Sequence, residues 1–386
     1  MPKANLLYIL TKLELGGAQT QLLTLLKNLD KTRFNLFLFT AKKGLLVNEA
    51  NSLSGLTLHR SGFLERSIDP LKDLLAFIEM FRFIKKHKID IVHTHSSKAG
   101  IIGRWAAALA GVKIIFHTVH GWSFNDFQPA IIKWVFIGLE RFSARFTKKI
   151  IVVSEHDKKR GLAFAIGREE QYCLLRYGID KSPFEVKDPL VRKELGIGAD
   201  DLVVGTISCF KPQKALGNFL KLAALIHATL PQTKFLVIGD GVLRRKIEKS
   251  ISVYGLGAVF ILTGWRRDIP RVLSAMDVFV LTSLWEGLPI SAIEAMAAAL
   301  PVVVTHTGGV GEIIEEGKTG ALAPCQDMTS MLQKVLPLLR DEGLRKQMGQ
   351  NARISVKNRF NIEDMVRESE LLYVRSLQED SGAYAC

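Results

Sequence analysis

The sequence predicts an α/β fold made of two similar domains, each a parallel sheet covered by helices on both faces. At 386 residues the chain is long enough for about two domains. Short apolar segments rich in Val, Ile and Phe alternate with longer segments of helical periodicity, once before and once after a polar stretch over residues 180–201. Uninterrupted apolar strands separated by helices are typical of parallel sheets buried on both faces. Ligands of such sheets bind at the carboxyl ends of the strands, so we expect the site in a cleft between the domains.

The first domain is expected over residues 1–180. Its predicted strands are the apolar segments 5–10, 34–40, 89–93, 113–119, 150–154 and 172–175. Helical periodicity predicts helices between them, over 18–28, 71–87 and 99–110.

The second domain is expected over residues 181–361, and the polar stretch 180–201 is its predicted hinge to the first domain. The predicted strands are 202–208, 234–239, 259–263, 277–283 and 302–305, and the predicted helices between them are 216–230, 242–254 and 269–275. Three helical segments follow, near 328–340, 343–360 and 362–379.

Composition and charge exclude several classes of protein. The chain is 48% hydrophobic and 23% charged, which excludes a disordered or collagen-like protein. Its four cysteines form no Cys-x-x-Cys pair, which argues against a zinc site or a disulfide framework: Cys173, Cys209, Cys325 and Cys386. The apolar run near the N-terminus is too short for a signal peptide, and the longest uncharged stretch, 295–311, contains Pro301 and His306. We therefore expect a cytoplasmic protein.

The net charge of +14 is concentrated in the first half of the chain. Residues 1–185 contain 28 Lys and Arg against 16 Asp and Glu, whereas the remainder contains 24 against 22. A basic half indicates an anionic partner, such as an anionic membrane surface, a phosphorylated acceptor or a nucleic acid. No nucleic-acid-binding signature accompanies the charge, so we expect no nucleic-acid partner.

The most specific local pattern is a pair of carboxylates, Glu286 and Glu294, eight positions apart at the end of a predicted strand. Pro289 suits the first turn of a helix, which places Glu286 in the strand-to-helix loop and Glu294 more than a turn into the helix. Both carboxylates can then line one pocket and accept hydrogen bonds from sugar hydroxyls, while the helix N-terminus attracts phosphate. The alternative is two acids that are favoured near a helix start only by the helix dipole.

Two lysines, Lys211 and Lys214, directly follow the predicted strand 202–208. At the carboxyl end of a strand they can neutralise a diphosphate, although a solvated loop would explain them equally well. In the first domain, Gly16 and Gly17 lie between the first strand and the first helix, where paired glycines let backbone N–H groups approach a phosphate. The pattern is not Gly-x-Gly-x-x-Gly, which disfavours a dinucleotide-binding dehydrogenase.

Four histidines fall at the ends of neighbouring predicted strands: His93, His95, His117 and His120. No carboxylate or thiolate accompanies them, and the chain contains no Asp-x-Asp pair, so we expect neither a metal site nor any other cofactor. His93 and His117 alternate within strands and are expected in the core. His120 is the best candidate to face the ligand.

Taken together, these motifs resemble the retaining glycosyltransferases of family 4, which have the two-domain GT-B fold. The resemblance extends over nearly the whole chain in an ordered series: Gly16-Gly17, His93 to Gly100, His120-Gly121, Val153 to Glu155, Pro212 to Lys214, Gly239 to Gly241, Gly264 to Arg266, Glu286 with Glu294, and Gly308 to Glu312. It implies an α/β fold of two Rossmann-like parallel-sheet domains that face each other across a cleft, with a final helix at about 362–386 that packs back on the first domain.

The resemblance also implies a role for each matched residue. Glu294 binds the ribose hydroxyls of a nucleotide-sugar donor, Glu286 meets the donor sugar and Lys214 neutralises the diphosphate. His120 contacts the donor sugar, and Glu286, His120 and Lys214 are the implied catalytic residues. The remaining implied donor-binding residues are the phosphate-facing Gly16 and Gly17, the base-framing Trp265 and Arg266, and Lys211, Gly287, Leu288 and Ile290.

Three positions depart from the family pattern. Cys209 stands where the family usually has an arginine, and a thiol cannot pair with a diphosphate, so Lys211 is the candidate substitute. Leu288 and Pro289 replace residues of a Gly-Phe-Gly pattern, which removes one backbone donor. Tyr177 stands where the family usually has asparagine. These departures affect the identity of the donor more than the activity.

The function that follows is transfer of a sugar from a nucleoside-diphosphate donor, with UDP expected, to a lipid-linked or saccharide acceptor in cell-surface polysaccharide or glycolipid synthesis. Retention of configuration is implied by the resemblance. The alternatives are a GT-B sugar-nucleotide epimerase or hydrolase and a non-catalytic sugar-nucleotide-binding module. Segments 71–87 and 129–149 are helical, aromatic and basic, so with the basic first half they favour peripheral binding to the inner face of the plasma membrane, with core packing as the alternative.

Overall fold

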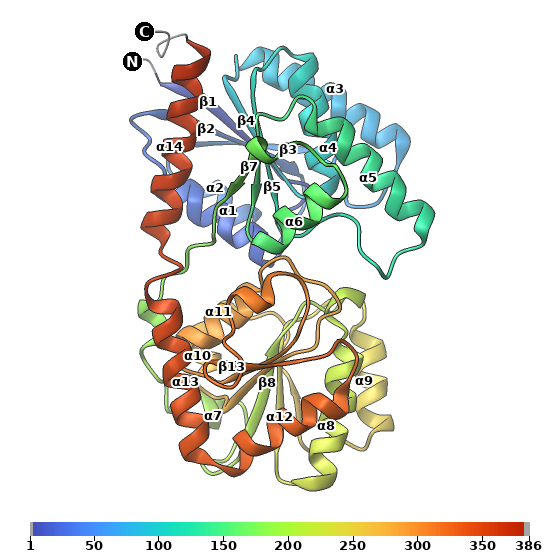
Figure 1. Ribbon diagram of the computed structural model, residues 1–386, viewed down its shortest axis with the longest axis vertical. Coiled ribbons are helices and arrows are strands. Elements are labelled where there is room, and N and C mark those ends of the chain that lie inside the picture. Colours follow the sequence, from blue (N-terminus) through green and yellow to red (C-terminus); the bar gives the residue numbers. More distant parts are fainter. Residues whose placement is uncertain (1–2, 382–386) are drawn as a thin grey trace. The chain divides into compact units, whose positions relative to one another are not determined.

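A computed structural model describes residues 3–381 (Figure 1). The chain divides into two compact units, and each is considered by itself. Unit 1 comprises residues 1–178 and 362–386, and unit 2 comprises residues 179–361. Residues 382–386, which include Cys386 and the end of the expected final helix, lie outside the described residues.

Unit 1 contains a seven-stranded parallel sheet of strand order β3-β2-β1-β4-β5-β6-β7. Its strands are β1 (Ala4–Ile9), β2 (Phe34–Ala41), β3 (Leu56–Ser61), β4 (Ile91–His95), β5 (Ile114–Val119), β6 (Lys149–Val152) and β7 (Tyr172–Leu174). Every residue of β4 and β5 is buried, as a central strand covered on both faces requires. Because the strand order reverses between β1 and β4, their carboxyl ends form the topological switch point of this sheet.

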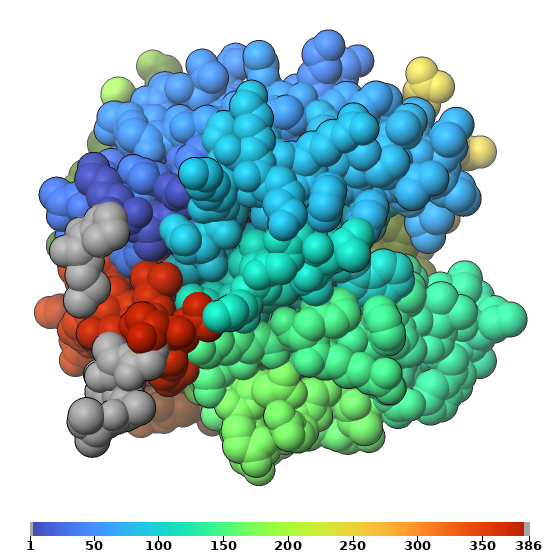
Figure 2. Space-filling model, turned by 90° about the horizontal axis from the view of Figure 1, so that it is seen from above, coloured from blue at the N-terminus to red at the C-terminus, as the bar shows by residue number. Residues whose placement is uncertain are grey.

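The helices of unit 1 cover both faces of this sheet. They are α1 (Gly17–Asn28), α2 (Val47–Asn51), α3 (Pro70–Lys86), α4 (Ser97–Leu109), α5 (Ala130–Ala144), α6 (Glu155–Ala163) and α14 (Ile362–Asp380), with the short 3-10 helix η1 (Glu169–Gln171). Although α14 ends the chain, it packs on α1 and β5. Its buried Tyr373 hydroxyl lies 2.7 Å from the hydroxyl of Tyr8 in β1, and Figure 2 shows α14 (red) beside the N-terminal segment (blue).

Unit 2 contains a six-stranded parallel sheet of order β10-β9-β8-β11-β12-β13. Its strands are β8 (Val203–Ile207), β9 (Lys234–Ile238), β10 (Phe260–Leu262), β11 (Val278–Leu281), β12 (Val302–Thr305) and β13 (Gly320–Ala323). The strand order reverses between β8 and β11, so their carboxyl ends form the switch point. All residues of β11 and β12 are buried.

The helices of unit 2 are α7 (Leu190–Glu194), α8 (Leu216–Thr229), α9 (Arg244–Val253), α10 (Ile269–Leu273), α11 (Ile290–Ala297), α12 (Met328–Arg340) and α13 (Glu342–Lys357), with the 3-10 helices η2 (Ser182–Phe184), η3 (Pro212–Lys214) and η4 (Gly308–Glu312). Helices α8, α9 and α12 pack over β8, β9 and β11 in one large apolar cluster. No helix among residues 3–381 is both long enough and apolar enough to cross a membrane.

The predicted class, two α/β domains with parallel sheets, is confirmed, but two strands and the hinge were not predicted correctly. Strands β3 and β13 lack a pronounced apolar run: β3 is only half-buried, and β13 is four small or apolar residues that begin at Gly320. Residues 180–201 are not a free linker. They contain η2 and α7 and belong wholly to unit 2.

Candidate active site

The switch point of unit 2 brings together two residues that the sequence singled out. Lys214 closes η3 after β8, and Glu286 lies in the loop after β11. The Nζ atom of Lys214 is 2.5 Å from Oε1 of Glu286, and the two side chains are 19% and 7% exposed. The sheet topology therefore joins the predicted diphosphate-binding cation and the predicted sugar-binding carboxylate in one ion pair.

The η3 segment is fixed to the loop after β11 by hydrogen bonds. The side-chain amide of Gln213 donates to the Trp285 carbonyl oxygen at 2.9 Å, and the Leu284 N–H donates to the Gln213 carbonyl oxygen at 2.8 Å. The Thr282 hydroxyl donates to the carbonyl oxygen of Lys214 at 3.3 Å. These bonds position the Lys214 backbone independently of its own ion pair.

A glycine pair packs against the other side of the same loop. Gly308 has a positive φ of 57°, and a Cβ atom placed on it would lie 1.8 Å from the Glu286 carbonyl oxygen. The Gly309 N–H donates to the Gly287 carbonyl oxygen at 2.8 Å. Only glycine permits both the left-handed backbone and this close approach. The motif containing Gly308 thus shapes the Glu286 loop, a role that sequence reasoning did not assign to it.

Glu294 lies on the second turn of α11, which begins at Ile290. Pro289, expected inside the first turn, is instead the N-cap, with an extended backbone of φ −77° and ψ 103°. Burial raises the pKa of Glu294 to about 7. Gly287 precedes the helix, and the neighbouring donor-site candidates Leu288 and Ile290 are both buried, at 4% and 8% exposure. Leu288 and Ile290 therefore pack in the protein and leave few side-chain atoms free to meet a ligand.

Lys211 and Trp265 lie on loops of unit 2. Lys211 is the N-cap residue of η3, three positions before Lys214, and its side chain is partly exposed. Trp265 is 38% exposed in the loop that follows β10. Within residues 3–381, no side-chain hydrogen bond or ion pair joins Lys211 or Trp265 to the pair of Lys214 and Glu286.

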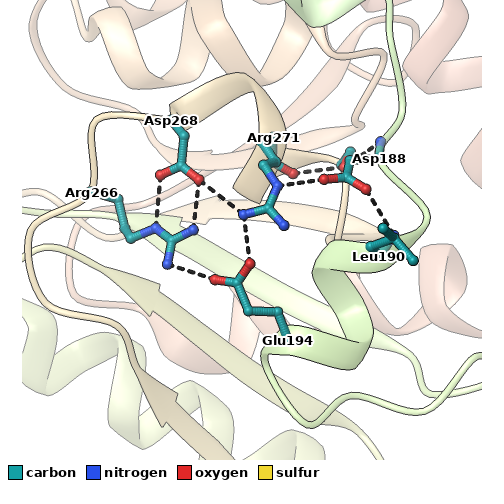
Figure 3. A network of polar contacts seen from close by, with 7 residues as sticks. Asp188, Leu190, Glu194, Arg266, Asp268 and Arg271 are labelled. Atoms are coloured by element: carbon teal, nitrogen blue, oxygen red, sulfur yellow. Dashed lines mark hydrogen bonds and ion pairs between the residues drawn. The ribbon is translucent and has the colours of Figure 1, made fainter.

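The guanidinium of Arg266 is held by carboxylates, as Figure 3 shows. Asp268 accepts from Nε at 2.8 Å and from Nη2 at 2.6 Å, and Glu194 accepts from Nη1 at 2.9 Å. Arg271 extends the network by pairing with Glu194 and Asp188. Since the guanidinium of Arg266 is hydrogen-bonded within this network, we expect only the backbone of Arg266 to contact a ligand. Asp188 and Glu194 also fasten the stretch that the sequence predicted as a hinge.

In unit 1 the predicted phosphate loop lies at the other switch point. Gly16 is the N-cap of α1 and has no side chain to satisfy the first N–H groups of the helix, which begins at Gly17. Across the switch point, the hydroxyl oxygens of Thr11 and Ser96 are 2.7 Å apart, and Ser96 precedes α4 with a positive φ of 61°. The arrangement leaves the amino end of α1 open to an anion.

The four histidines are buried or nearly buried beside this switch point and bond to one another or to hydroxyls. His93 contacts the Tyr373 hydroxyl through Nδ1 and the Thr118 hydroxyl through Nε2, both at 2.7 Å, and burial lowers its pKa to about 3. His117 Nδ1 is 2.9 Å from the Thr94 hydroxyl. Both are therefore neutral residues of the core, each with a hydroxyl partner.

His120 follows β5 and lines a small cavity together with Ser97, Ser123 and Glu140. Its Nε2 lies 2.9 Å from His95 Nδ1, and burial lowers the pKa of His120 to about 4. No group of three or more His, Cys, Asp or Glu side chains within residues 3–381 is arranged to hold a metal ion.

Comparisons with known proteins cover most of the chain. Residues 15–182 match the family described as Glycosyltransferase Family 4, and residues 188–355 match the family described as Glycosyl transferases group 1. The chain is 34% identical, over 80% of its length and 81% of the relative's, to an Escherichia coli protein named UDP-Gal:alpha-D-GlcNAc-diphosphoundecaprenol alpha-1,3-galactosyltransferase. The chain belongs to glycosyltransferase family 4. This family 4 glycosyltransferase is also 27% identical, over 75% of its length and 78% of the relative's, to a Campylobacter jejuni protein named N,N'-diacetylbacillosaminyl-diphospho-undecaprenol alpha-1,3-N-acetylgalactosaminyltransferase.

Solved structures share the fold of this family 4 glycosyltransferase. The HepE protein of Anabaena, solved in complex with UDP and glucose, superposes with a TM-score of 0.82 at 21% identity and covers 95% of this chain and 99% of its own. Sucrose-phosphate synthase from Thermosynechococcus elongatus superposes with a TM-score of 0.84 at 20% identity, covering 98% and 100%. The GT-B fold expected from the sequence is thus confirmed.

Proposed function

We propose that this glycosyltransferase moves a sugar from a UDP-linked donor to a saccharide carried on a lipid diphosphate, in the synthesis of a cell-surface polysaccharide or glycolipid. The ion pair between Lys214 and Glu286 at the switch point of unit 2 supports the proposal, because a cation and a carboxylate side by side suit the diphosphate and the hydroxyls of one sugar diphosphate. The name of the Escherichia coli relative supports both the donor and the acceptor class.

Each donor group has a proposed partner. The ribose hydroxyls donate to Glu294, the donor sugar hydroxyls donate to Glu286, and the backbone beside Trp265 and Arg266 borders the base. Lys214, assisted by Lys211, neutralises the diphosphate, with the open amino end of α1 at Gly16 and Gly17 as a second source of N–H donors. His120 contacts the donor sugar.

The chemistry follows from the charge that develops on the leaving group. Breaking the bond between sugar and diphosphate leaves an oxocarbenium-like sugar and extra negative charge on the UDP oxygens. Preorganised cations and N–H groups stabilise that charge, and losing one such donor typically costs about 3–4 kcal/mol of barrier. The acceptor hydroxyl then attacks from the side on which UDP leaves, with retention, and its proton passes to an oxygen of the leaving diphosphate. The lysines serve in place of a metal ion.

We further propose that α5 carries the enzyme to an anionic membrane surface. Four apolar side chains at helical spacing on α5 are between 49% and 75% exposed: Ile131, Trp134, Val135 and Phe142. Arg141 and Arg145 are exposed at the end of the same helix, where they can meet lipid phosphates. Helix α3 has no such aromatic face, because its phenylalanines at 77, 81 and 83 pack into or against the core.

A transfer assay tests the function. The protein is incubated with a panel of UDP-sugars, with and without an N-acetylglucosamine diphospholipid acceptor, and the products are separated by mass. We expect one donor to give an acceptor-dependent product whose anomeric configuration, measured by NMR, is that of the donor. A chelator should leave the rate unchanged. Rapid release or isomerisation of the donor sugar without acceptor would indicate a hydrolase or epimerase instead.

A further inference from the structure

His120 has a hydrogen-bond partner at each of its ring nitrogens, and both partners are aromatic side chains. Its Nδ1 lies 2.9 Å from the Tyr177 hydroxyl, and the two rings stack at 5.8 Å with an angle of 13°. Its Nε2 lies 2.9 Å from Nδ1 of His95, whose ring stacks on the other side at 5.2 Å and 23°. Tyr177 lies just after β7 and His95 ends β4, so residues distant in sequence fix the position and plane of one imidazole.

Both histidines of this chain of rings are neutral at pH 7. Burial lowers the pKa of His120 to about 4, and it lowers the pKa of His95 well below its usual value, with the neighbouring histidines adding to the effect. A neutral imidazole has one N–H and one lone pair. The two bonds of His120 therefore run in one direction or the other: either Tyr177 donates to His120, which donates to His95, or His95 donates to His120, which donates to Tyr177.

The far nitrogen of His95 decides between these two directions. His95 is 3% exposed, and its Nε2 has no hydrogen-bond partner among the described residues. The neighbouring His93 cannot supply one, since both of its nitrogens bond to the hydroxyls of Tyr373 and Thr118. A buried N–H without an acceptor is rarer in proteins than a buried acceptor without a donor. His95 therefore keeps a lone pair on Nε2 and its proton on Nδ1.

We propose that Tyr177 and His95 are positioning residues that hold His120 as the Nδ1–H tautomer, in a fixed ring plane, before the donor binds. His95 Nδ1–H donates to His120 Nε2, and His120 Nδ1–H donates to the Tyr177 oxygen. A donor-sugar hydroxyl that takes the place of His95 at Nε2 must then donate its hydrogen bond. The consequence for donor binding rests on the proposed contact of His120 with the donor sugar. The assignment of the tautomer does not depend on that contact.

Nitrogen NMR of histidine side chains labelled with ¹⁵N measures the tautomer directly in the full-length protein. In the wild type we expect the His120 signals, assigned with His120→Gln, to show a protonated Nδ1 and an unprotonated Nε2. In Tyr177→Phe, the Nδ1–H of His120 loses its acceptor. In the other tautomer, the Nε2–H of His95 has no acceptor either. Neither tautomer is then favoured, and we expect averaged or doubled nitrogen signals from His120. Tyr172→Phe is the matched control, because the Tyr172 hydroxyl donates to the Ile166 carbonyl at 2.6 Å and the wild-type pattern should persist.

A protonated Nε2 on His120 in the wild type would overturn the proposal, and that measurement requires no variant to fold. An unchanged tautomer in a folded Tyr177→Phe protein would overturn the role of Tyr177. In the transfer assay, Tyr177→Phe should lower kcat about 2- to 10-fold, the usual effect of one hydrogen bond, with a smaller change in KM. If no UDP-sugar is transferred by the wild type, the proposed function fails while the tautomer result stands.

Discussion

The ammonium of Lys214 lies 2.5 Å from a carboxylate oxygen of Glu286, 72 positions later in the chain. The two residues lie in the loops that follow two adjacent central strands, β8 and β11. The pair compensates both charges, and the side chain of Glu286 is nearly buried. In the proposed complex, the diphosphate supplies a second anion beside the lysine, so Lys214 would interact with both Glu286 and the leaving group.

Replacing Lys214 should slow the reaction more than it weakens donor binding. We expect Lys214→Ala to reduce kcat about 10²- to 10³-fold, because the lysine acts on charge that develops as the diphosphate leaves. Steady-state kinetics with the transferred UDP-sugar measure the effect. Lys221→Ala, which removes an exposed lysine from α8, is the control and should leave kcat unchanged. Wild-type kinetics for Lys214→Ala would remove Lys214 from the diphosphate site.

Donor affinity should increase with pH because of Glu294. Burial raises the pKa of Glu294 to about 7, so the carboxyl is mostly protonated at pH 6 and mostly ionised at pH 8. Only the ionised form offers all its oxygen lone pairs to the ribose hydroxyls. We expect the affinity for a UDP-sugar, measured by calorimetry, to rise about tenfold between pH 6 and pH 8.

The variant Glu294→Gln should bind the UDP-sugar more weakly and with no such pH dependence. Glu248→Gln on the exposed face of α9 should keep the wild-type profile. A pH slope that persists in Glu294→Gln would assign the titration to another group.

Gly308 should tolerate no side chain. In Gly308→Ala, the new Cβ would collide with the Glu286 carbonyl oxygen, and the φ of 57° would be strained. We expect a loss of about 1–3 kcal/mol of unfolding free energy, measured by urea denaturation, together with most of the activity. Gly257→Ala is the control, because nothing lies within 4 Å of the corresponding Cβ position. Equal stability of the two variants would contradict the close approach.

Binding to anionic vesicles should depend on the exposed face of α5. We expect Trp134→Ser combined with Arg141→Glu to reduce co-sedimentation with vesicles that contain phosphatidylglycerol. Binding of the wild type should weaken as salt is raised, because exposed charges are screened over about 8–10 Å at physiological ionic strength. Val242→Ser, at an 84% exposed apolar position of unit 2, is the control. An equal loss of vesicle binding in Val242→Ser would argue against this surface. Wild-type binding that does not change with salt concentration would argue against it as well.

Much of the fold could be predicted from local patterns. Apolar strands such as β11 and β12 could be recognised because a strand buried on both faces needs an apolar run. Strand β3 could not, since this edge strand is only half-buried and needs no such run. Strand β13 is mostly buried, but it has only four residues and begins with a glycine. Pro289 suggested the start of α11 correctly to within one residue.

The sequence by itself determined which residues stand at the strand ends, because the order of strands, glycines and charges is written along the chain. Only the tertiary structure decided which of them meet. Lys214 reaches Glu286 because β8 and β11 are neighbours in the sheet, and Tyr177 reaches His120 from the loop after β7, two strands away from β5. Arg266 is held by Asp268 and by Glu194, which lies 72 positions earlier in the chain. Local periodicity is set by neighbours in the chain, whereas hydrogen bonds and ion pairs are set by distances in space.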